Sequence, residues 1–291
     1  MQAIIAAFTP IWIIGALGWL SARFGLASGH LQRALTEFAF TVAMPAVLFT
    51  TLSRTPLGQI QPRPLLAFAI STFAVGLPAL ALLRGKLPDR VIGAMSSAYV
   101  NSGNLGIPVG LYVLHDATFV VSVMVFQILV VSPLIFIGLG AERSSLLAPL
   151  RTPIVVASVL GLGMSALGLH LPDAVSSPLE ILGGAAVPLA LFSLGMSLNG
   201  SAVSWRETGP VVALKLLLQP LVAFLAGRFL LHLDGPALFA AVLFAGLPTA
   251  QNTYVYAAEY GRPTGLPRDA ILLSTFGSMV TLSLIAFLGA G

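Results

Sequence analysis

Apolar residues run along this chain in long, continuous stretches that are separated by short polar segments. A helix needs about 20 consecutive apolar residues to cross a bilayer. Breaks at charges, prolines and glycines divide the chain into ten such stretches, and the pattern predicts an all-α membrane protein with ten transmembrane helices. The predicted spans are roughly 3–22, 33–53, 64–84, 90–114, 117–140, 152–169, 176–199, 208–231, 235–258 and 269–289.

Composition supports this prediction and removes several other classes of protein. The 291 residues are 57% hydrophobic and only 8% charged, with a mean hydropathy of +0.97, whereas soluble domains carry about 25% charged residues. A transmembrane β-barrel would alternate apolar and polar residues, and these runs do not. The absence of cysteine excludes disulfides and thiolate chemistry. We find no nucleophile–base pair, metal triad or phosphate loop, so we expect neither an enzyme nor a cofactor.

The positive charges are distributed unevenly between alternate loops. Ten of the 14 Lys and Arg residues fall on one side of the predicted membrane, three fall on the other, and Lys215 lies inside a span. The positive-inside rule then places both termini outside the cytoplasm, as in a multi-pass protein of a bacterial inner membrane. Because the basic residues are scattered singly, the pI of about 9.9 does not indicate a nucleic-acid partner. The N-terminal segment lacks a basic region and a cleavage site, so we expect it to be the first span.

A weak internal repeat relates the two halves of the chain. "TEFAFTVAMPAVLFTTL" (36–52) resembles "LEILGGAAVPLALFSLG" (179–195) at an offset of 143 residues, and Pro108 aligns with Pro248 at an offset of 140. Halves at 1–145 and 146–291 would each hold five spans. Since five is odd, the second half would enter the membrane from the opposite side, which is the signature of an inverted-topology repeat.

Two predicted spans are interrupted at corresponding places in the two halves. The fourth contains "NSGNLGIPVG" and the ninth contains "AGLPTAQN". Unpaired backbone groups cost several kcal/mol in the bilayer core, so such segments survive only where protein or a water-filled cavity covers them. A helix that restarts there presents free N–H groups and a positive dipole end, which suit a carboxylate. The predicted substrate-binding residues are Asn101, Asn104, Pro108, Pro248, Thr249, Gln251 and Asn252. The alternative interpretation is a structural kink with amide groups that join helices.

Further polar residues lie inside other spans. Lys215 is near the middle of the eighth span, and Gln219 lies one turn later on the same face. We interpret this pair as a charge or coupling site: a counter-charge for the substrate, a substitute for a coupling cation, or a titrating group. The alternative is a structural lysine that snorkels to the interface. Gln127 in the fifth span is a weaker candidate for the substrate cavity. The sequence leaves open whether Glu37, Glu180 and Glu259 are functional.

These stretches resemble the auxin efflux carrier family. The resemblance covers essentially the whole chain and is carried by "NSGNLGIPVGLY", "GLPTAQNTYVYAAEYG", "KLLLQPLVA" and "FAFTVAMPAVLF". It implies a fold similar to bile-acid symporters and sodium/proton antiporters, in which spans 4 and 9 cross at Pro108 and Pro248. It also implies a scaffold of spans 1, 2, 6 and 7 that forms a homodimer interface, a mobile transport domain of spans 3–5 and 8–10, and elevator-type transport. Asn101, then Asn104, would bind the substrate carboxylate.

The predicted function is therefore secondary transport of small organic anions, either auxin-like monocarboxylates or malate- and malonate-like dicarboxylates. The polar residues Gln251 and Asn252 after Pro248, and the short loop between spans 5 and 6, depart from the plant members and make auxin itself less expected. The alternative is a sodium- or proton-coupled carrier of another anion, such as a bile-acid-like one. A channel or a receptor is a further alternative, although polar residues cluster near the midplane instead of forming a continuous path. The ion coupling stays open.

Overall fold

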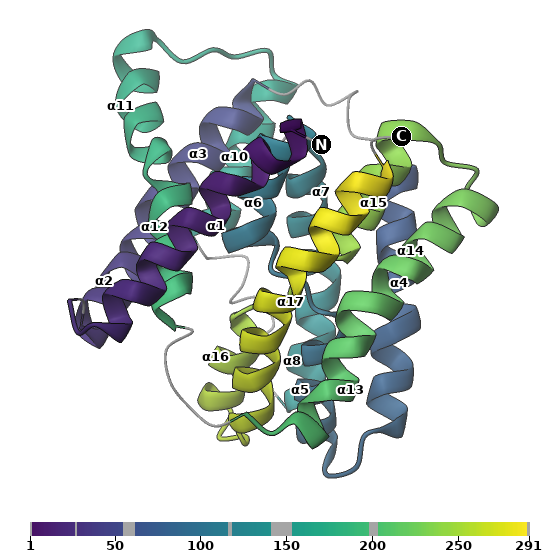
Figure 1. The fold of residues 1–291 in the computed structure, drawn as a ribbon. Helices are drawn as coiled ribbons and strands as arrows, with labels where there is room; N and C mark the ends of the chain where they lie inside the picture. Colours follow the sequence, from purple (N-terminus) through teal and green to yellow (C-terminus); the bar gives the residue numbers. More distant parts are fainter. Residues whose placement is uncertain are drawn as a thin grey trace.

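The computed structural model describes residues 2–26, 28–54, 62–115, 118–140, 153–197 and 203–289. Throughout these ranges the secondary structure is helical, and the β-type pairing consists of one isolated bridge, between Val100 and Thr249. The predicted all-α class is therefore confirmed. The marks of the two chain ends lie near the same end of the molecule (Figure 1).

Six helices form a first helix group, at the upper left of Figure 1. Helix α1 packs along α12, and α3 packs against both α10 and α11, so helices from the two halves of the chain are neighbours here. The members are α1 (Gln2–Arg23), α2 (Gly29–Phe38), α3 (Met44–Ser53), α10 (Pro153–Ala166), α11 (Asp173–Gly184) and α12 (Ala186–Ser197).

The remaining helices form a second helix group. Helix α4 packs against α5, α14 and α15, and α17 contacts α13, α15 and α5. The members are α4 (Pro62–Leu82), α5 (Leu87–Ala98), α6 (Ile107–Val109), α7 (Thr118–Phe126), α8 (Ser132–Leu139), α13 (Trp205–Ala213), α14 (Gln219–Leu225), α15 (Gly235–Ala245), α16 (Asn252–Glu259) and α17 (Gly265–Gly289).

Several of these helices meet the length and composition of a membrane span. Within the described ranges, five are both long and apolar enough, and they are Gly29–Ser53, Pro62–Leu82, Thr118–Leu139, Trp205–Leu230 and Gly265–Gly289. Shorter apolar helices include Val155–Ala166 and Gly235–Ala245. Many large apolar side chains on the outside of the helices are exposed, for example Ile181 and Val280, which is the surface expected of a protein whose solvent is lipid.

Four prolines of the helical segments follow π-helical turns. Four turns end two residues before a proline, and they are η1 (Ala39–Ala43), η3 (Ser102–Gly106), η5 (Gln127–Val131) and η7 (Leu214–Leu218). In three of these turns the residue before the proline donates its N–H to a carbonyl five residues back, as Gln219 does to Leu214. A proline cannot donate, and its ring clashes with the carbonyl four residues earlier. The wider turn relieves that clash, so the helix bends and continues.

Glycines allow the closest helix contacts of the first helix group. A Cβ atom at Gly18 of α1 would clash with the backbone carbonyl of Phe192 in α12, and a Cβ at Gly161 of α10 would meet the carbonyl of Phe49 in α3. Small residues of this kind let helix backbones approach closely in membrane proteins. The two contacts are related by the same shift, since Gly161 follows Gly18, and Phe192 follows Phe49, by the offset of 143 found in the sequence.

Candidate functional site

Two helical segments of the second helix group are interrupted. In the first, α5 ends at Ala98 and the helix resumes at Ser102 with η3, which continues through α6 into η4 (Gly110–Leu114). In the second, α15 ends at Ala245 and the helix resumes at α16. We call residues 99–101 the first interruption and residues 246–251 the second interruption. Each leaves backbone groups at the ends of two half-helices that need new partners.

The two interruptions pair with each other in an antiparallel arrangement around Val100 and Thr249. The N–H of Asn101 donates to the carbonyl of Pro248 over 2.8 Å, and the N–H of Ala250 donates to the carbonyl of Tyr99 over 3.0 Å. Val100 and Thr249 are 1% and 0% exposed. Each interruption therefore supplies hydrogen-bond partners for part of the other's buried backbone.

Lys215 and Gln219 bind the ends of the half-helices that lead into this pair. The Lys215 ammonium donates to the carbonyl of Ala245, the last residue of α15, over 2.8 Å, and to Gln219 Oε1 over 2.6 Å. The Gln219 amide donates to the carbonyl of Ala98, the last residue of α5, over 3.0 Å. Both side chains are fully buried. A cation is favourable at a helix C-terminus because the helix dipole is negative there.

Other polar side chains bind the interruptions from neighbouring helices. Gln127 donates to the carbonyl of Val100 over 2.9 Å and accepts a hydrogen bond from the Ser102 hydroxyl. The Thr249 hydroxyl donates to the carbonyl of Ser96 over 2.7 Å, and the N–H of Thr249 donates to Ser274 Oγ over 3.0 Å. Gln127 and Thr249 thus stabilise non-helical backbone that lipid could not solvate.

The other predicted site residues occupy different positions around the pair. Asn101 is 4% exposed at the start of the second half-helix of its segment. Gln251 is partly buried and Asn252 is exposed at the start of α16, where the Asn252 side chain forms a hydrogen bond with Tyr99. Asn104 belongs to η3, and its side chain lies outside the described residues. Pro248 lies within the second interruption, between Leu247 and Thr249.

Pro108 requires a correction. The first break was expected at this proline, but Pro108 lies inside α6 and is buried, and the helix is broken seven to nine residues earlier, at 99–101. The physical reason is the π-helical turn before it, which accommodates the missing N–H without breaking the helix. Sequence reasoning also missed Tyr99, Ser96 and Ser274 as neighbours of the break, because ordinary serines and a tyrosine in apolar spans carry no local signal of it.

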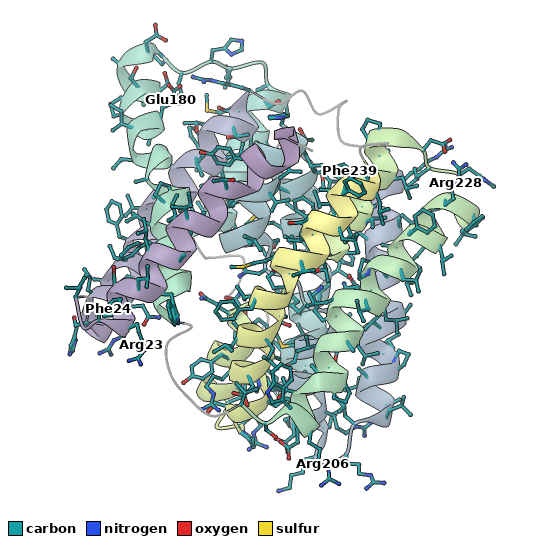
Figure 2. The ribbon with its side chains drawn as sticks, viewed as in Figure 1. Arg23, Phe24, Glu180, Arg206, Arg228 and Phe239 are labelled. Atoms are coloured by element: carbon teal, nitrogen blue, oxygen red, sulfur yellow. The ribbon has the colours of Figure 1, made fainter. Side chains whose placement is uncertain are left out.

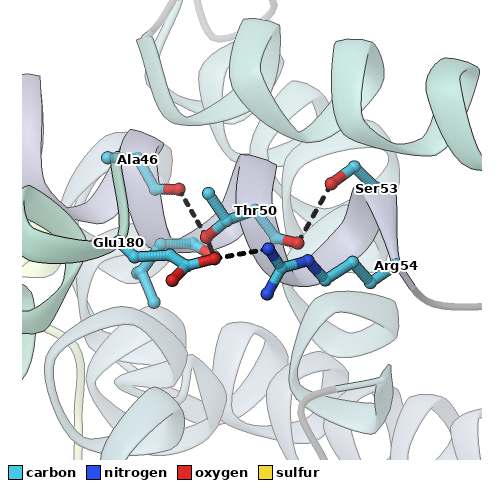
Figure 3. Close-up of polar contacts among 6 residues, drawn as sticks. Ala46, Thr50, Ser53, Arg54 and Glu180 are labelled. Atoms are coloured by element: carbon cyan, nitrogen blue, oxygen red, sulfur yellow. Dashed lines mark hydrogen bonds and ion pairs between the residues drawn. The ribbon is translucent and has the colours of Figure 1, made fainter. Parts of the chain in front are cut away.

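Two of the three glutamates that the sequence left open, Glu37 and Glu180, lie in the first helix group, away from the interruptions. Glu180 of α11 forms an ion pair with Arg54, which follows α3 (Figure 3). The side chains are 46% and 61% exposed, so this contact joins two helices of the first helix group at its surface and contributes little stability. Glu37 is exposed on α2, and the side chain of Glu259 is outside the described residues.

The two ends of each interruption differ in their electrostatic character. The C-terminal ends of α5 and α15 are already bonded by Gln219 and Lys215. The opposite ends, at Ser102 and Asn252, are helix N-termini with a positive dipole. Helix η3 contacts α12, so the first of these N-termini lies near the boundary between the two helix groups. A buried anion fits this arrangement better than a cation does.

Comparison with known proteins supports a role in transport. The family described as "Membrane transport protein" matches residues 3–143 and 141–286. A putative malonate transporter of Rhizobium meliloti is 26% identical over 99% of this chain and 96% of its own length. An uncharacterized transporter of Methanocaldococcus jannaschii is 24% identical over 94% of this chain and 95% of its own. A probable auxin efflux carrier component 5c of Oryza sativa is 29% identical over 46% of this chain and 38% of its own.

Proposed function

Because this chain belongs to the membrane transport protein family, which includes the auxin efflux carriers, we propose that it is a secondary carrier of small organic anions. The observation that carries this proposal is the buried pairing of two interrupted helices around Val100 and Thr249. Paired, broken helices are the arrangement in which transporters bind substrates near the midplane of the bilayer.

The proposed anion site lies at the N-terminal ends of the resumed half-helices. Asn101 is its first ligand, because it is buried at the start of η3 and its backbone joins the two interruptions. Asn104, Gln251 and Asn252 are further amide ligands. Gln127, Pro248 and Thr249 shape and hold the backbone of the site. Neutral amides and helix dipoles bind a carboxylate without a fixed opposite charge, which lets the substrate leave again.

The proposed architecture has ten spans in an inverted repeat of five and five, with the halves 1–145 and 146–291 and with spans 4 and 9 crossing. Support comes from the reciprocal glycine contacts: Gly18 meets Phe192, and Gly161 meets Phe49. A pseudo-twofold relation between the halves exchanges these two contacts. Each of the ten predicted spans also overlaps helical residues of the chain.

The proposed motion is of the elevator type. The first helix group corresponds to spans 1, 2, 6 and 7 and would be the scaffold, with the homodimer interface; the second group corresponds to spans 3–5 and 8–10 and would move. Support comes from the packing, since the interrupted helices make most of their contacts within the second group. Figure 2 places Arg23 and Arg206 toward the lower end of the molecule and Arg228 at the upper end. We assign the lower end to the cytoplasm of a bacterial inner membrane, following the charge rule.

Lys215 is proposed to take the place of a coupling cation. In broken-helix transporters, sodium ions and protons bind at half-helix C-terminal ends and unwound carbonyls, and the Lys215 ammonium occupies that position at Ala245. Transport would then proceed without sodium. Flux that is unchanged when potassium replaces sodium supports this assignment, whereas a strict sodium requirement contradicts it and favours the coupled symporter.

Small dicarboxylates of the malonate type are the proposed substrates. The putative malonate transporter aligns with this chain from end to end, whereas the auxin efflux carrier component aligns with 46% of it. The polar residues Gln251 and Asn252 also offer hydrogen bonds for a second carboxylate.

The test is uptake of radiolabelled malonate into proteoliposomes that contain the purified chain. A carrier gives saturable uptake that is accelerated by unlabelled malonate on the opposite side. Asn101→Ala should raise KM about tenfold, because hydrogen bonds to charged groups contribute about 1.5–3 kcal/mol. Ser53→Ala, in the first helix group, is the matched control and should keep wild-type uptake. Non-saturable uptake without counterflow would indicate a channel and reject the carrier.

A further inference from the structure

We propose that the second helix group binds an anionic phospholipid, with an acyl chain in an apolar cavity and the phosphate at a basic rim beside it. This proposal depends on the membrane location of the chain and not on which substrate it carries. It rests on a cavity between three helices and on a cluster of basic residues in and beside the turn that joins two of them.

The cavity has a volume of about 120 Å³ and lies between α4, α5 and α8. Apart from Thr72 and Tyr99, its lining side chains carry no oxygen or nitrogen. The lining residues are Thr72, Phe73, Gly76, Leu77, Leu80, Val91, Ala94, Met95, Ala98, Tyr99, Val131, Leu134 and Ile135. Apolar cavities of roughly 150 Å³ stay dry and take up hydrocarbon guests, so the chemistry of the lining selects an apolar occupant.

The cavity opens toward the outer surface of the helices. Leu77 and Leu134, on two of its walls, are 58% and 53% exposed, and both lie within helices that are long enough to span a membrane. The solvent at that depth is the hydrocarbon of the bilayer. A lipid acyl chain therefore reaches the cavity sideways from the membrane. Its inner end touches Ala98 and Tyr99, so an inserted chain would pack against the first interruption.

A basic rim lies where α4 and α5 meet the membrane surface. Arg84 and Lys86 are exposed in the turn between these helices. Arg90 donates from Nε to the carbonyl of Leu80, itself a lining residue, over 2.7 Å, which keeps its guanidinium beside a wall of the cavity. The nearby Asp89 lies 3.6 Å from Arg262, so it already faces a cation. The three basic residues are at the end assigned to the cytoplasm, where membranes present anionic headgroups.

Charge complementarity selects the lipid headgroup. A basic residue near the surface of an anionic membrane contributes about 1 kcal/mol to the free energy of binding, which corresponds to roughly a fivefold change in affinity. Arginine also binds phosphate through two parallel hydrogen bonds. A zwitterionic lipid would use the cavity but gain little at the rim, and a free fatty acid would lack the phosphate. The site should therefore prefer phosphatidylglycerol to both.

The experiment measures lipid binding to the purified full-length chain by native mass spectrometry. Phosphatidylglycerol, phosphatidylcholine and palmitate are titrated separately. The expected result is one tight phosphatidylglycerol site, with at least tenfold weaker binding of the other two. If palmitate binds as tightly as phosphatidylglycerol, the site is a fatty-acid site and the proposal is overturned. Equal binding of the two phospholipids would show that the basic rim does not bind the headgroup and would also overturn the proposal.

Variants separate the two parts of the site. The double change Arg84→Gln with Lys86→Gln affects exposed residues and should weaken the binding of phosphatidylglycerol about 25-fold. The control, Arg23→Gln with Arg33→Gln, also changes exposed residues on the same side and should leave this binding unchanged. A Cβ atom at Gly76 meets only the Cβ of Ala98, at 3.5 Å, so the side chain of Gly76→Leu should fill the cavity. This variant should weaken the binding of both phospholipids. Gly163→Leu, which has open space around it, is its control. Equal losses in the test and control variants would overturn the proposal.

Discussion

At the first interruption the carbonyl of Ala98 accepts a hydrogen bond from the neutral amide of Gln219, whereas at the second the carbonyl of Ala245 accepts one from the ammonium of Lys215. The two donors lie four residues apart on one helical segment and are bonded to each other. The backbone pairing of the interruptions is nearly symmetric, but the charge is not. One half-helix end is neutralised by a full positive charge, and the other is satisfied by an amide alone.

Under the proposed function, the covalently attached ammonium of Lys215 takes the place that a bound ion has in other carriers. A buried ammonium at the C-terminal end of α15 stabilises that negative dipole end and needs no ion from solution. The following variants change the donors at these helix ends, singly or together.

The largest effect is expected from Lys215→Met. The variant removes the charge and leaves the carbonyl of Ala245 and the Oε1 atom of Gln219 without this donor, and each buried unsatisfied group costs about 1–3 kcal/mol. Malonate uptake should fall roughly 100-fold, since each 1.36 kcal/mol corresponds to a factor of ten. Size-exclusion chromatography checks that the variant is folded, and wild-type uptake would show that the charge is not needed.

A second variant moves the charge from one helix end to the other. The double variant Lys215→Gln with Gln219→Lys places the ammonium nearer the carbonyl of Ala98. If the role of the charge is to offset helix ends, this variant should recover uptake about tenfold relative to Lys215→Met and remain independent of sodium. Uptake as low as that of Lys215→Met would mean that the position at Ala245 is essential.

A smaller effect is expected at the first interruption from Gln219→Leu. This change leaves the Ala98 carbonyl without the amide and removes the Oε1 acceptor of Lys215, but it keeps the ammonium bonded to Ala245. One unsatisfied neutral group predicts about a tenfold decrease in uptake. If malonate uptake by Gln219→Leu is as low as uptake by Lys215→Met, the charge has no special role and the two interruptions are equivalent.

The sequence predicted the helical class and the pair of polar residues, but not the backbone groups that they bind. The helical class followed from the apolar runs, and the face shared by Lys215 and Gln219 followed from their spacing. Their partners, the carbonyls of Ala98 and Ala245, could not be predicted, because they come from distant helices. Pro108 was misleading for a local reason: a proline marks a weak point in a helix, and a π-helical turn can absorb it. The division into ten spans and the binding roles stay predictions.

The smallest effect is expected from Thr249→Val, which keeps the shape of the side chain at the centre of the pairing. It removes the hydrogen bond from the Thr249 hydroxyl to the carbonyl of Ser96 but keeps the N–H contact with Ser274 Oγ. A typical neutral hydrogen bond contributes about 1 kcal/mol, so uptake should fall only about fivefold, with sodium independence unchanged. Val100→Thr is the matched change on the opposite strand of the bridge and removes no side-chain bond. A larger loss for Val100→Thr than for Thr249→Val would mean that packing, and not the hydroxyl, holds the interruptions together.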